Sequence, residues 1–405
     1  MVKPRYKQTE IGLIPEEWAC REIGSFADVC MCKRIFAEQT SEMGEIPFYK
    51  IGTFGKKADA YISRALFEEY RRNYSYPQKG DVLISAAGTL GRTVVYDGEE
   101  AYFQDSNIVW LDIDKSQISN DYLYHYYKVI KWTPAEGSTI ARLYNGIINS
   151  TNVAVPPKPE QKAISEALSD IDSLIVNLKK LITKKKAIKQ GAMQELLTGN
   201  RRLQGYTEKW DKVKLGECCG FLSGGTPSKA NHEWWNGTIP WISSSDISAN
   251  DVNRIPISRF ISQEALDHSA TKLCPVHSVL IVSRVGVGKV AVNCCELCTS
   301  QDFTTLVPRL HDAHYLAYCL LPIMQEKASQ AQGTSIKGIT TDDIAEIEVF
   351  LPEKDEQKAI ASVLSDMDMD VQRLEQKLLK YCSVRQGMMN ELLTGRIRLI
   401  DKEDA

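Results

Sequence analysis

The segment EQKAISEALSDID at residues 160–172 returns as EQKAIASVLSDMD at residues 356–368. Further on, QGAMQELLTGNRRL at residues 190–203 returns as QGMMNELLTGRIRL at residues 386–399. Over this region 21 of 44 paired positions are identical without a gap, at a constant offset of 196 residues. A solenoid unit is only about 20–50 residues long. The chain is therefore a duplicated half-protein, and this duplication decides its architecture.

Apolar residues recur in both copies at alternating spacings of four and three residues. This heptad spacing is typical of a helix that buries one seam against another helix. Gly199 and Gly395 each follow an ELLT string, where glycine commonly ends a helix. We therefore predict two long helices whose seams contain Ile164, Leu168, Ile171, Ile175 and Leu178 in the first copy and Ile360, Leu364, Met367, Val371 and Leu374 in the second.

The two predicted helices need a surface on which to bury their seams. Because both seams have the same phase, we expect an antiparallel pair within one chain, forming a coiled coil. Each helix would have about 40 residues and be roughly 60 Å long at 1.5 Å per residue. Two alternatives remain open, namely a helix packed on its own domain and a coiled coil between two copies of the chain.

Upstream of each long helix the two halves match only at scattered landmarks, such as IPFYKIG at residues 46–52 and IPWISSSDI at residues 239–247. Short strand-like strings and one helical stretch recur in both halves. We predict an α+β (mixed α/β) fold with an internal pseudo-twofold repeat, in which two similar domains are separated by the helix pair. The predicted segments are 1–155 for the first domain, 156–204 for the first long helix, 205–350 for the second domain, and 351–405 for the second long helix with the tail.

Composition narrows the class of protein. The 405 residues carry a net charge of −3 and include 43% apolar residues, a balance typical of globular proteins. The charge is uneven, because residues 158–202 contain ten Lys or Arg and five Asp or Glu. There is no apolar stretch of a membrane span and no leader-like start. The eleven cysteines lack the spacing of a disulfide framework, so we expect a reduced, cytoplasmic chain.

Motifs for bond chemistry are missing from the sequence. There is no Asn-Pro-Pro-aromatic string, and GVGKV at residues 286–290 and GTLGRT at residues 88–93 depart from the phosphate-binding loop pattern. Cys295 and Cys298 have a C-x-x-C spacing, with Cys274 and His277 as the nearest candidates to complete a zinc site. Buried free cysteines are the favoured interpretation. We assign no catalytic residues and no metal ligands.

Several strings resemble the specificity subunits of type I restriction-modification systems. They are YKQTEIGLIPEEW at residues 6–18, GGTPSKANHEWWNGTIPWISSSDI at residues 224–247, and the paired EQKAI and ELLTG elements. The first domain departs from this pattern, because it carries CMCKRIFAEQTSE where a GGTPS-type string is expected. The resemblance covers essentially the whole chain. It implies two target recognition domains held apart by two conserved helices.

The resemblance also implies partners. Such a subunit binds double-stranded DNA and two methyltransferase (M) subunits, and through them the ATP-dependent restriction (R) motor-nuclease subunits. We expect no cofactor on this chain, whereas S-adenosylmethionine, ATP and Mg²⁺ are expected on the partner subunits. The chain itself is then not an enzyme. Each domain would read one half of a bipartite DNA site, and the helix pair would set the spacer.

Polar and basic loop residues are the candidates for reading DNA. The alternative for each is an ordinary solvated loop residue, and for the basic residues at 92 and 289 it is a charge on a strand-connecting turn. The candidates are Lys56, Lys57, Arg92, Arg142 and Asn145 in the first domain, and Arg284, Lys289, Ser335 and Lys337 in the second. A competing hypothesis for the whole chain is a coiled-coil scaffold that joins two proteins and never contacts DNA.

Overall fold

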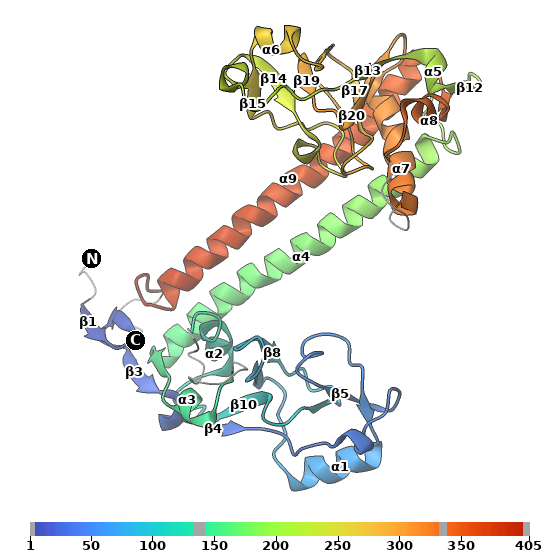
Figure 1. The fold of residues 1–405 in the computed structure, drawn as a ribbon. Helices are drawn as coiled ribbons and strands as arrows, with labels where there is room; N and C mark the ends of the chain where they lie inside the picture. The colour runs from blue at the N-terminus through green and yellow to red at the C-terminus, as the bar shows by residue number, and fades with distance from the viewer. Residues whose placement is uncertain (1–4, 131, 133–141, 332–337, 400–405) are drawn as a thin grey trace. The chain divides into compact units, whose positions relative to one another are not determined.

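The two long helices are present, and the chain divides into two compact units that each contain part of both. The computed structural model describes residues 5–130, 132, 142–331 and 338–399. Unit 1 comprises Met1–Leu178 with Lys377–Ala405, and unit 2 comprises Lys179–Gln376. Helix α4 spans Lys158–Leu196 and helix α9 spans Lys354–Leu392, shown in green and red in Figure 1. Both have 39 residues, as the sequence duplication requires.

The ends of both long helices follow from local sequence. Pro159 lies in the first turn of α4, where a missing backbone N–H leaves no helical hydrogen bond unmade. Gly199 and Gly395 follow the last turns with φ of +73° and +69°. Only glycine adopts this left-handed conformation without a steric penalty, so both glycines end their helices as expected.

Within each unit, the included parts of α4 and α9 run antiparallel. In unit 1 the Arg385 guanidinium on α9 donates to the Asp172 carboxylate on α4. In unit 2 the Lys189 ammonium on α4 donates to the Asp368 carboxylate on α9. The two pairs are related by the 196-residue offset of the sequence repeat. The duplication is therefore also a duplication of inter-helix contacts.

The first seam residues of each helix belong to the core of the domain that precedes it. Ile164 and Leu168 are 0% and 1% exposed and share one cluster with strands of unit 1 and with Leu392 of α9. Ile360 and Leu364 are buried in the equivalent cluster of unit 2. The helix therefore packs on its own domain and on the second helix at once. Of the other seam positions, the structure buries Ile171, Ile175, Leu178 and Val371 and half-buries Met367 and Leu374.

In the described part of unit 1, the larger sheet has the strand order β4-β10-β7-β8, with all neighbours antiparallel. A second sheet has the order β6-β5-β9, in which β5 and β9 are parallel, and two smaller sheets pair β1 with β2 and β3 with β11. The strands are β1 Tyr6–Thr9, β2 Gly12–Pro15, β3 Ala19–Glu22, β4 Ala27–Cys30, β5 Ile46–Tyr49, β6 Tyr61–Ile62, β7 Val82–Ser85, β8 Thr93–Val95, β9 Tyr102–Phe103, β10 Ile108–Ile113 and β11 Asn152–Val155. The helices are α1 Arg64–Asn73, α2 Asn120–Tyr126 and α3 Asn145–Asn149, with 3-10 turns at Ile23–Ser25 and Ala37–Gln39.

Unit 2 repeats this topology among its described residues. The order β13-β20-β17-β18 corresponds strand by strand to the larger sheet of unit 1, and β15-β14-β19-β16 again contains one parallel pair, β14 with β19. The strands are β12 Asp211–Lys214, β13 Cys219–Ser223, β14 Ile239–Ile242, β15 Arg259–Ile261, β16 Leu273–Cys274, β17 Val279–Val282, β18 Val290–Val292, β19 Leu297–Thr299, β20 Phe303–Pro308 and β21 Glu348–Leu351. The helices are α5 Leu215–Cys218, α6 Gln263–Asp267, α7 Ala313–Ala331 and α8 Thr341–Ala345, with 3-10 turns at His232–Trp235 and Ser244–Asp246.

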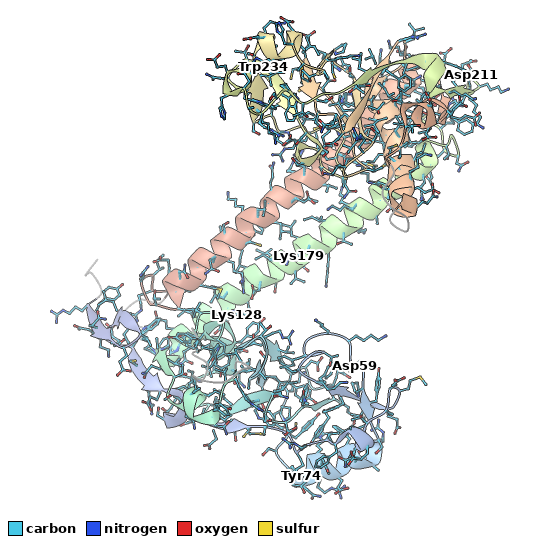
Figure 2. All side chains as sticks on the ribbon, viewed as in Figure 1. Asp59, Tyr74, Lys128, Lys179, Asp211 and Trp234 are labelled. Atoms are coloured by element: carbon cyan, nitrogen blue, oxygen red, sulfur yellow. The ribbon has the colours of Figure 1, made fainter. Side chains whose placement is uncertain are left out.

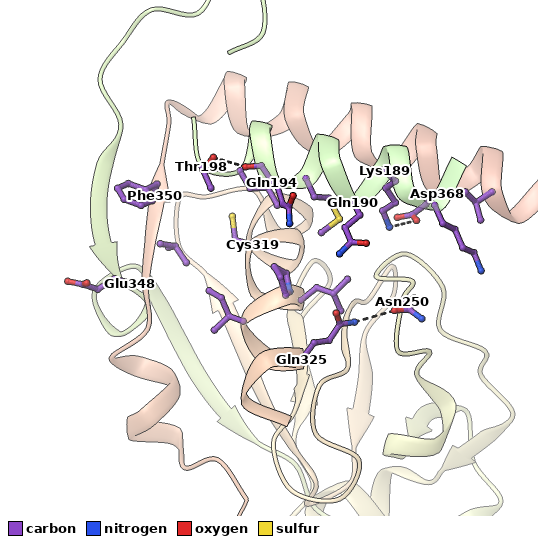
Figure 3. A pocket seen from close by; sticks show the side chains of 18 residues that line it. Lys189, Gln190, Gln194, Thr198, Asn250, Cys319, Gln325, Glu348, Phe350 and Asp368 are labelled. Carbon is purple, nitrogen blue, oxygen red and sulfur yellow. Dashed lines mark hydrogen bonds and ion pairs between the residues drawn. The ribbon is translucent and has the colours of Figure 1, made fainter. Parts of the chain in front are cut away.

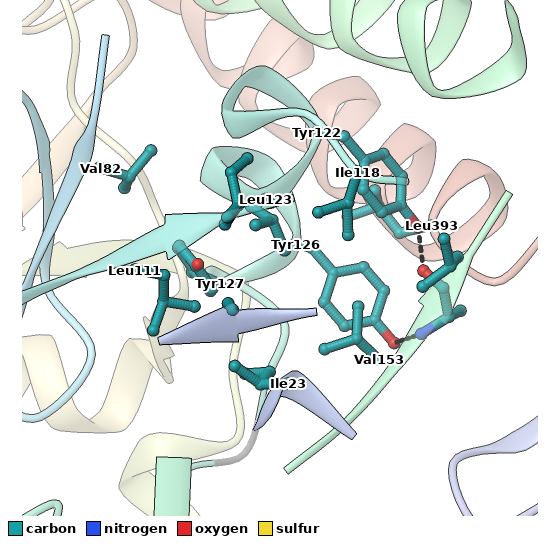
Figure 4. Close-up of a cluster of buried hydrophobic side chains, with 14 of the residues drawn as sticks. Ile23, Val82, Leu111, Ile118, Tyr122, Leu123, Tyr126, Tyr127, Val153 and Leu393 are labelled. Atoms are coloured by element: carbon teal, nitrogen blue, oxygen red, sulfur yellow. Dashed lines mark hydrogen bonds between the residues drawn. The ribbon is translucent and has the colours of Figure 1, made fainter. Parts of the chain in front are cut away.

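The strand that precedes each long helix is fixed by a buried tyrosine. In unit 1 the Tyr122 hydroxyl donates to the Ala154 carbonyl at 2.9 Å, and the Ala154 N–H donates to the Tyr126 hydroxyl at 3.0 Å, as Figure 4 shows. In unit 2 the Tyr315 hydroxyl donates to the Phe350 carbonyl at 2.7 Å. These bonds pair the buried phenols with main-chain groups and tie α2 and α7 to the strand before each long helix. Among the described residues, no helix combines the length and apolarity that a membrane crossing requires.

Candidate nucleic-acid interface and helix anchors

Two equivalent loops each carry a basic residue that bonds to the main chain of its own domain. They are the β7–β8 loop in unit 1 and the β17–β18 loop in unit 2. The Arg92 guanidinium donates to the Ile51 carbonyl at 2.9 Å and lies 5.3 Å from the Phe54 ring centroid. The Lys289 ammonium donates to the Ser244 carbonyl at 2.8 Å. Ile51 and Ser244 both follow the central strand of the second sheet, β5 or β14. Each cation therefore holds the turn that follows this strand, and the two turns are equivalent in the two units.

Arg142 has a similar local role. Its guanidinium donates to the Ser106 carbonyl and hydroxyl at 3.2 and 2.7 Å and to the Asn107 side chain at 3.3 Å. Ser106 has a φ of +52°, a conformation that is uncommon for a residue with a side chain. The arginine therefore supports a strained turn beside the β7–β8 loop. Sequence reasoning identified its location on a loop but not its engagement with this turn.

The remaining candidates for DNA contact are either exposed on loops and helix ends or lie outside the residues that the structure describes. Lys56 and Lys57 are exposed in the loop that also contains Asp59, which is labelled in Figure 2. Asn145 is exposed at the first position of α3. In unit 2, Arg284 is exposed at the tip of the β17–β18 loop, next to a valine that is 68% exposed. Ser335 and Lys337 lie outside the described residues.

Sequence reasoning also missed polar residues that organise these loops. The Gln104 side-chain oxygen accepts from the Ile51 N–H at 2.9 Å, and Asp105 pairs with Arg34 at 2.9 Å. In unit 2 the Asp302 carbonyl accepts from the Ser283 N–H at 2.8 Å. The signal for them was present, because Gln-Asp recurs at equivalent positions in both halves. That recurrence marks a shared turn that holds the variable loops.

A buried glutamate at the start of each long helix forms the most closely duplicated contact. The Glu160 carboxylate is 0% exposed and accepts from the Trp18 indole at 2.8 Å and from the Arg398 guanidinium. The Glu356 carboxylate is 1% exposed and accepts from the Trp210 indole at 3.0 Å and from the Arg202 guanidinium at 2.6 and 2.7 Å.

The geometry of these anchors explains why the same Glu, Arg and Trp occur in both halves of the chain. A buried carboxylate is tolerated when it is paired and its oxygens accept several hydrogen bonds. Each glutamate joins three segments, namely the start of one long helix, the arginine just beyond the end of the other, and a tryptophan near the start of the domain. The repeated Glu, Arg and Trp are therefore explained by one contact made twice.

The glutamine after each glutamate completes the anchor. The Gln161 side chain accepts from the Ser119 N–H at 3.0 Å and donates to the Pro156 carbonyl at 2.9 Å. The Gln357 side chain accepts from the Asp312 N–H at 2.9 Å and donates to the Pro352 carbonyl at 2.7 Å. Each glutamine bonds the main chain before α2 or α7 to the turn before the long helix. The Glu-Gln pair is therefore structural in both copies.

The repeated Leu-Ser-Asp-x-Asp string places a second carboxylate, from its last residue, at each helix pair, with different neighbours in the two units. In unit 1, Asp172 accepts from Lys128, labelled in Figure 2, at 3.2 Å. The buried His125 imidazole lies 3.9 Å from the same carboxylate. Burial, with a smaller contribution from Lys128, lowers the pKa of His125 to about 4. In unit 2, Asp368 instead accepts from the Tyr318 hydroxyl at 2.7 Å.

Most of the cysteines are buried or half-buried free thiols in the described structure. Cys274 and Cys298 lie buried on the adjacent strands β16 and β19, and Cys294 is exposed on the loop before β19. Burial raises the pKa of the Cys298 thiol to about 11, so it stays protonated at neutral pH. Within the described ranges, no group of three or more His, Cys, Asp or Glu side chains has the arrangement of a metal site.

Comparison with known proteins identifies the family. One similar protein is "Putative type I restriction enzyme specificity subunit S.HindORF215P" of Haemophilus influenzae, 58% identical over 153 residues, which is 38% of this chain and 40% of that protein. Another is "Putative type I restriction enzyme MjaX specificity subunit" of Methanocaldococcus jannaschii, 26% identical over 422 aligned residues, 97% of each chain.

The fold is similar to a solved structure. The S subunit of a type I restriction-modification system from M. genitalium superposes with a TM-score of 0.62 at 16% identity, over 96% of this chain and 98% of that one. Residues 15–190 and 207–380 each match the family described as "Type I restriction modification DNA specificity domain". These two matches cover most of the chain, with one match in each half of the duplication. The chain belongs to the type I restriction-modification DNA specificity family, with two specificity domains.

Proposed function

We propose that each domain of this chain reads one half of a bipartite double-stranded DNA site, and that the paired helices set the unread spacer and dock two methyltransferase subunits. The restriction subunits then join through the methyltransferases. In this proposal the chain does no bond chemistry, works in the cytoplasm, and leaves S-adenosylmethionine, ATP and Mg²⁺ to its partners.

One observation carries the proposal. The two domains share their strand order and the anchors at Glu160 and Glu356, whereas the equivalent loops differ in sequence. Arg284 is exposed at the tip of the β17–β18 loop, and the equivalent position in unit 1 is Ala87. A constant framework with variable loops suits a protein that reads two different base sequences, because specificity resides in side chains that reach base edges.

A domain exchange tests half-site reading. Residues 19–155 are replaced by the corresponding segment of a relative, which keeps Trp18 and both long helices. Methylated sites are then mapped for the complex with its methyltransferase. One half of the recognised sequence should change while the other half stays. A change in both halves would refute independent reading, and a complex that binds no DNA would favour the scaffold hypothesis.

A further inference from the structure

Unit 2 contains an open groove between the end of α4, helix α7 and strand β21, shown in Figure 3. Its volume is about 680 Å³. The walls are largely apolar and include Met193, Leu197 and Phe350, and the rim carries Gln190 and Gln194, both exposed. The Phe350 side chain is 45% exposed, which is a large apolar area to leave in water on a folded strand.

The equivalent surface of unit 1 is buried. Met389 and Leu393, which correspond to Met193 and Leu197 through the 196-residue repeat, are 3% and 2% exposed. The residue equivalent to Phe350 is Ala154, which is 1% exposed. The same face of the repeated helix is therefore covered in one unit and open in the other.

The N-terminal hairpin formed by β1 and β2 contributes to this cover. Ile14 of β2 is 2% exposed and belongs to the same apolar cluster as Met389 and Leu393. The Tyr6 hydroxyl donates to the Gly395 carbonyl at 3.2 Å, and the hairpin turn reaches β11, where the Asn152 amide donates to the Glu10 carboxylate. In unit 2, the described residues between the end of α4 and β12 form no hairpin.

We propose that the groove of unit 2 receives an apolar loop or hairpin of the methyltransferase subunit, in the way that unit 1 receives its own N-terminal hairpin. The inference rests on the proposed function, because α4 forms one wall of the groove and belongs to the helix pair assigned to methyltransferase docking. Glu348 stands where unit 1 has Asn152, and its carboxylate is already paired with Lys212 of β12 at 2.5 Å. The groove therefore calls for an apolar side chain from the incoming segment, as Ile14 supplies in unit 1, and not for a partner to Glu348.

Only one of the two methyltransferases can use the groove, because the equivalent face in unit 1 is already buried. The two subunits then bind with unequal affinities although the helices are duplicated. A tryptophan at position 194 would fill the groove from its exposed rim without disturbing the core. The matched control is position 390, which is the equivalent exposed residue of α9.

The experiment titrates the chain with its cognate methyltransferase subunit and follows both binding steps by calorimetry and native mass spectrometry. Gln194→Trp should weaken one step by about tenfold, equivalent to about 1.4 kcal/mol. Asn390→Trp should leave both steps unchanged. A photo-reactive amino acid at position 194 should crosslink to the methyltransferase, and the same group at position 390 should do so much less.

Each outcome separates the two proposals. If the unmodified chain binds no methyltransferase, the proposed function fails and the groove proposal fails with it. If two methyltransferases bind but Gln194→Trp changes neither step, or both tryptophan variants weaken binding equally, only the groove proposal is overturned. Crosslinking of equal yield from both positions would overturn it in the same way.

Discussion

The two units use the same anchor and differ in what surrounds it. Glu160 of unit 1 and Glu356 of unit 2 each bind an indole and a guanidinium from equivalent positions. Beside the next carboxylate, unit 1 has the buried His125 and unit 2 has Tyr318. The two units therefore keep the same residues where a charge is buried, since a buried charge tolerates few arrangements of partners. Where the neighbours are not fixed by a buried charge, different side chains fill equivalent positions in the two units.

The largest effect should come from breaking one anchor. Arg398→Ala leaves the fully buried Glu160 carboxylate with only the Trp18 indole as a partner. Removing one partner of a buried ion pair costs about 3–5 kcal/mol. We expect the midpoint of urea unfolding to fall sharply for this variant, and also for Arg202→Ala at the equivalent anchor in unit 2.

A surface arginine provides the control. Arg396 is 66% exposed and pairs with Glu391 on the surface. Arg396→Ala should leave the unfolding midpoint unchanged, because exposed ion pairs contribute little. If Arg396→Ala and Arg398→Ala were equally destabilising, the buried anchor would not be the contact that preserves the duplication.

The repeat made the long helices and their ends predictable, because heptads and terminal glycines are local signals. Recurring strand-like strings predicted two similar mixed domains, but which strands pair within them came only from the structure. The anchors could not be predicted, because Trp18 and Arg398 meet Glu160 only through tertiary contacts across most of the chain. The same limit applied to Arg92 and Lys289, whose basic charge indicated a DNA contact while their bonds to main-chain carbonyls depend on the neighbouring sheet.

A second prediction sharpens the comparison at the variable loops. Arg284→Ala removes an exposed cation from the tip of the β17–β18 loop of unit 2. If it reads a guanine edge, discrimination at one half-site should fall by about 1–3 kcal/mol, with the other half-site unaffected. The measurement is methylation of a library of sites by the assembled complex. Equal weakening on every sequence, with a lower salt dependence, would instead indicate a phosphate contact.

A third prediction uses the histidine that only unit 1 has beside its helix carboxylate. Burial keeps His125 neutral in the folded chain, with a pKa of about 4 against 6.5 for an unperturbed group. Lys128 and Arg385 also oppose its protonation, and Asp172 favours it. Unfolding between pH 4 and 6.5 therefore takes up about one proton, and stability is lost as the pH falls through this range.

The test compares the unfolding free energies of the parent chain and His125→Gln from pH 7 to pH 4. The variant should lose less stability across this range, because glutamine does not titrate. A matched variant, His268→Gln, changes an exposed histidine of unit 2 and should keep the slope of the parent. An identical pH dependence for His125→Gln and the parent chain would contradict the assignment.

The smallest expected effect tests the helices as the ruler of the DNA spacer. Each unit contains one part of both helices, so an insertion in α4 alone would shift the seam of one unit against its partner helix. Four residues are therefore inserted into both helices where the units divide, after Leu178 and after Gln376. Each insertion adds about 6 Å of helix. Four residues make one full turn plus about 40°, so the heptad seams stay nearly in phase.

Because B-form DNA rises about 3.4 Å per base pair, the preferred spacer should lengthen by about one or two base pairs while both half-sites stay the same. Methylation mapping measures this, and the insertion in α4 alone serves as the control that should lose stability. A double insertion that methylates only the original spacing would show that the helices do not set the distance.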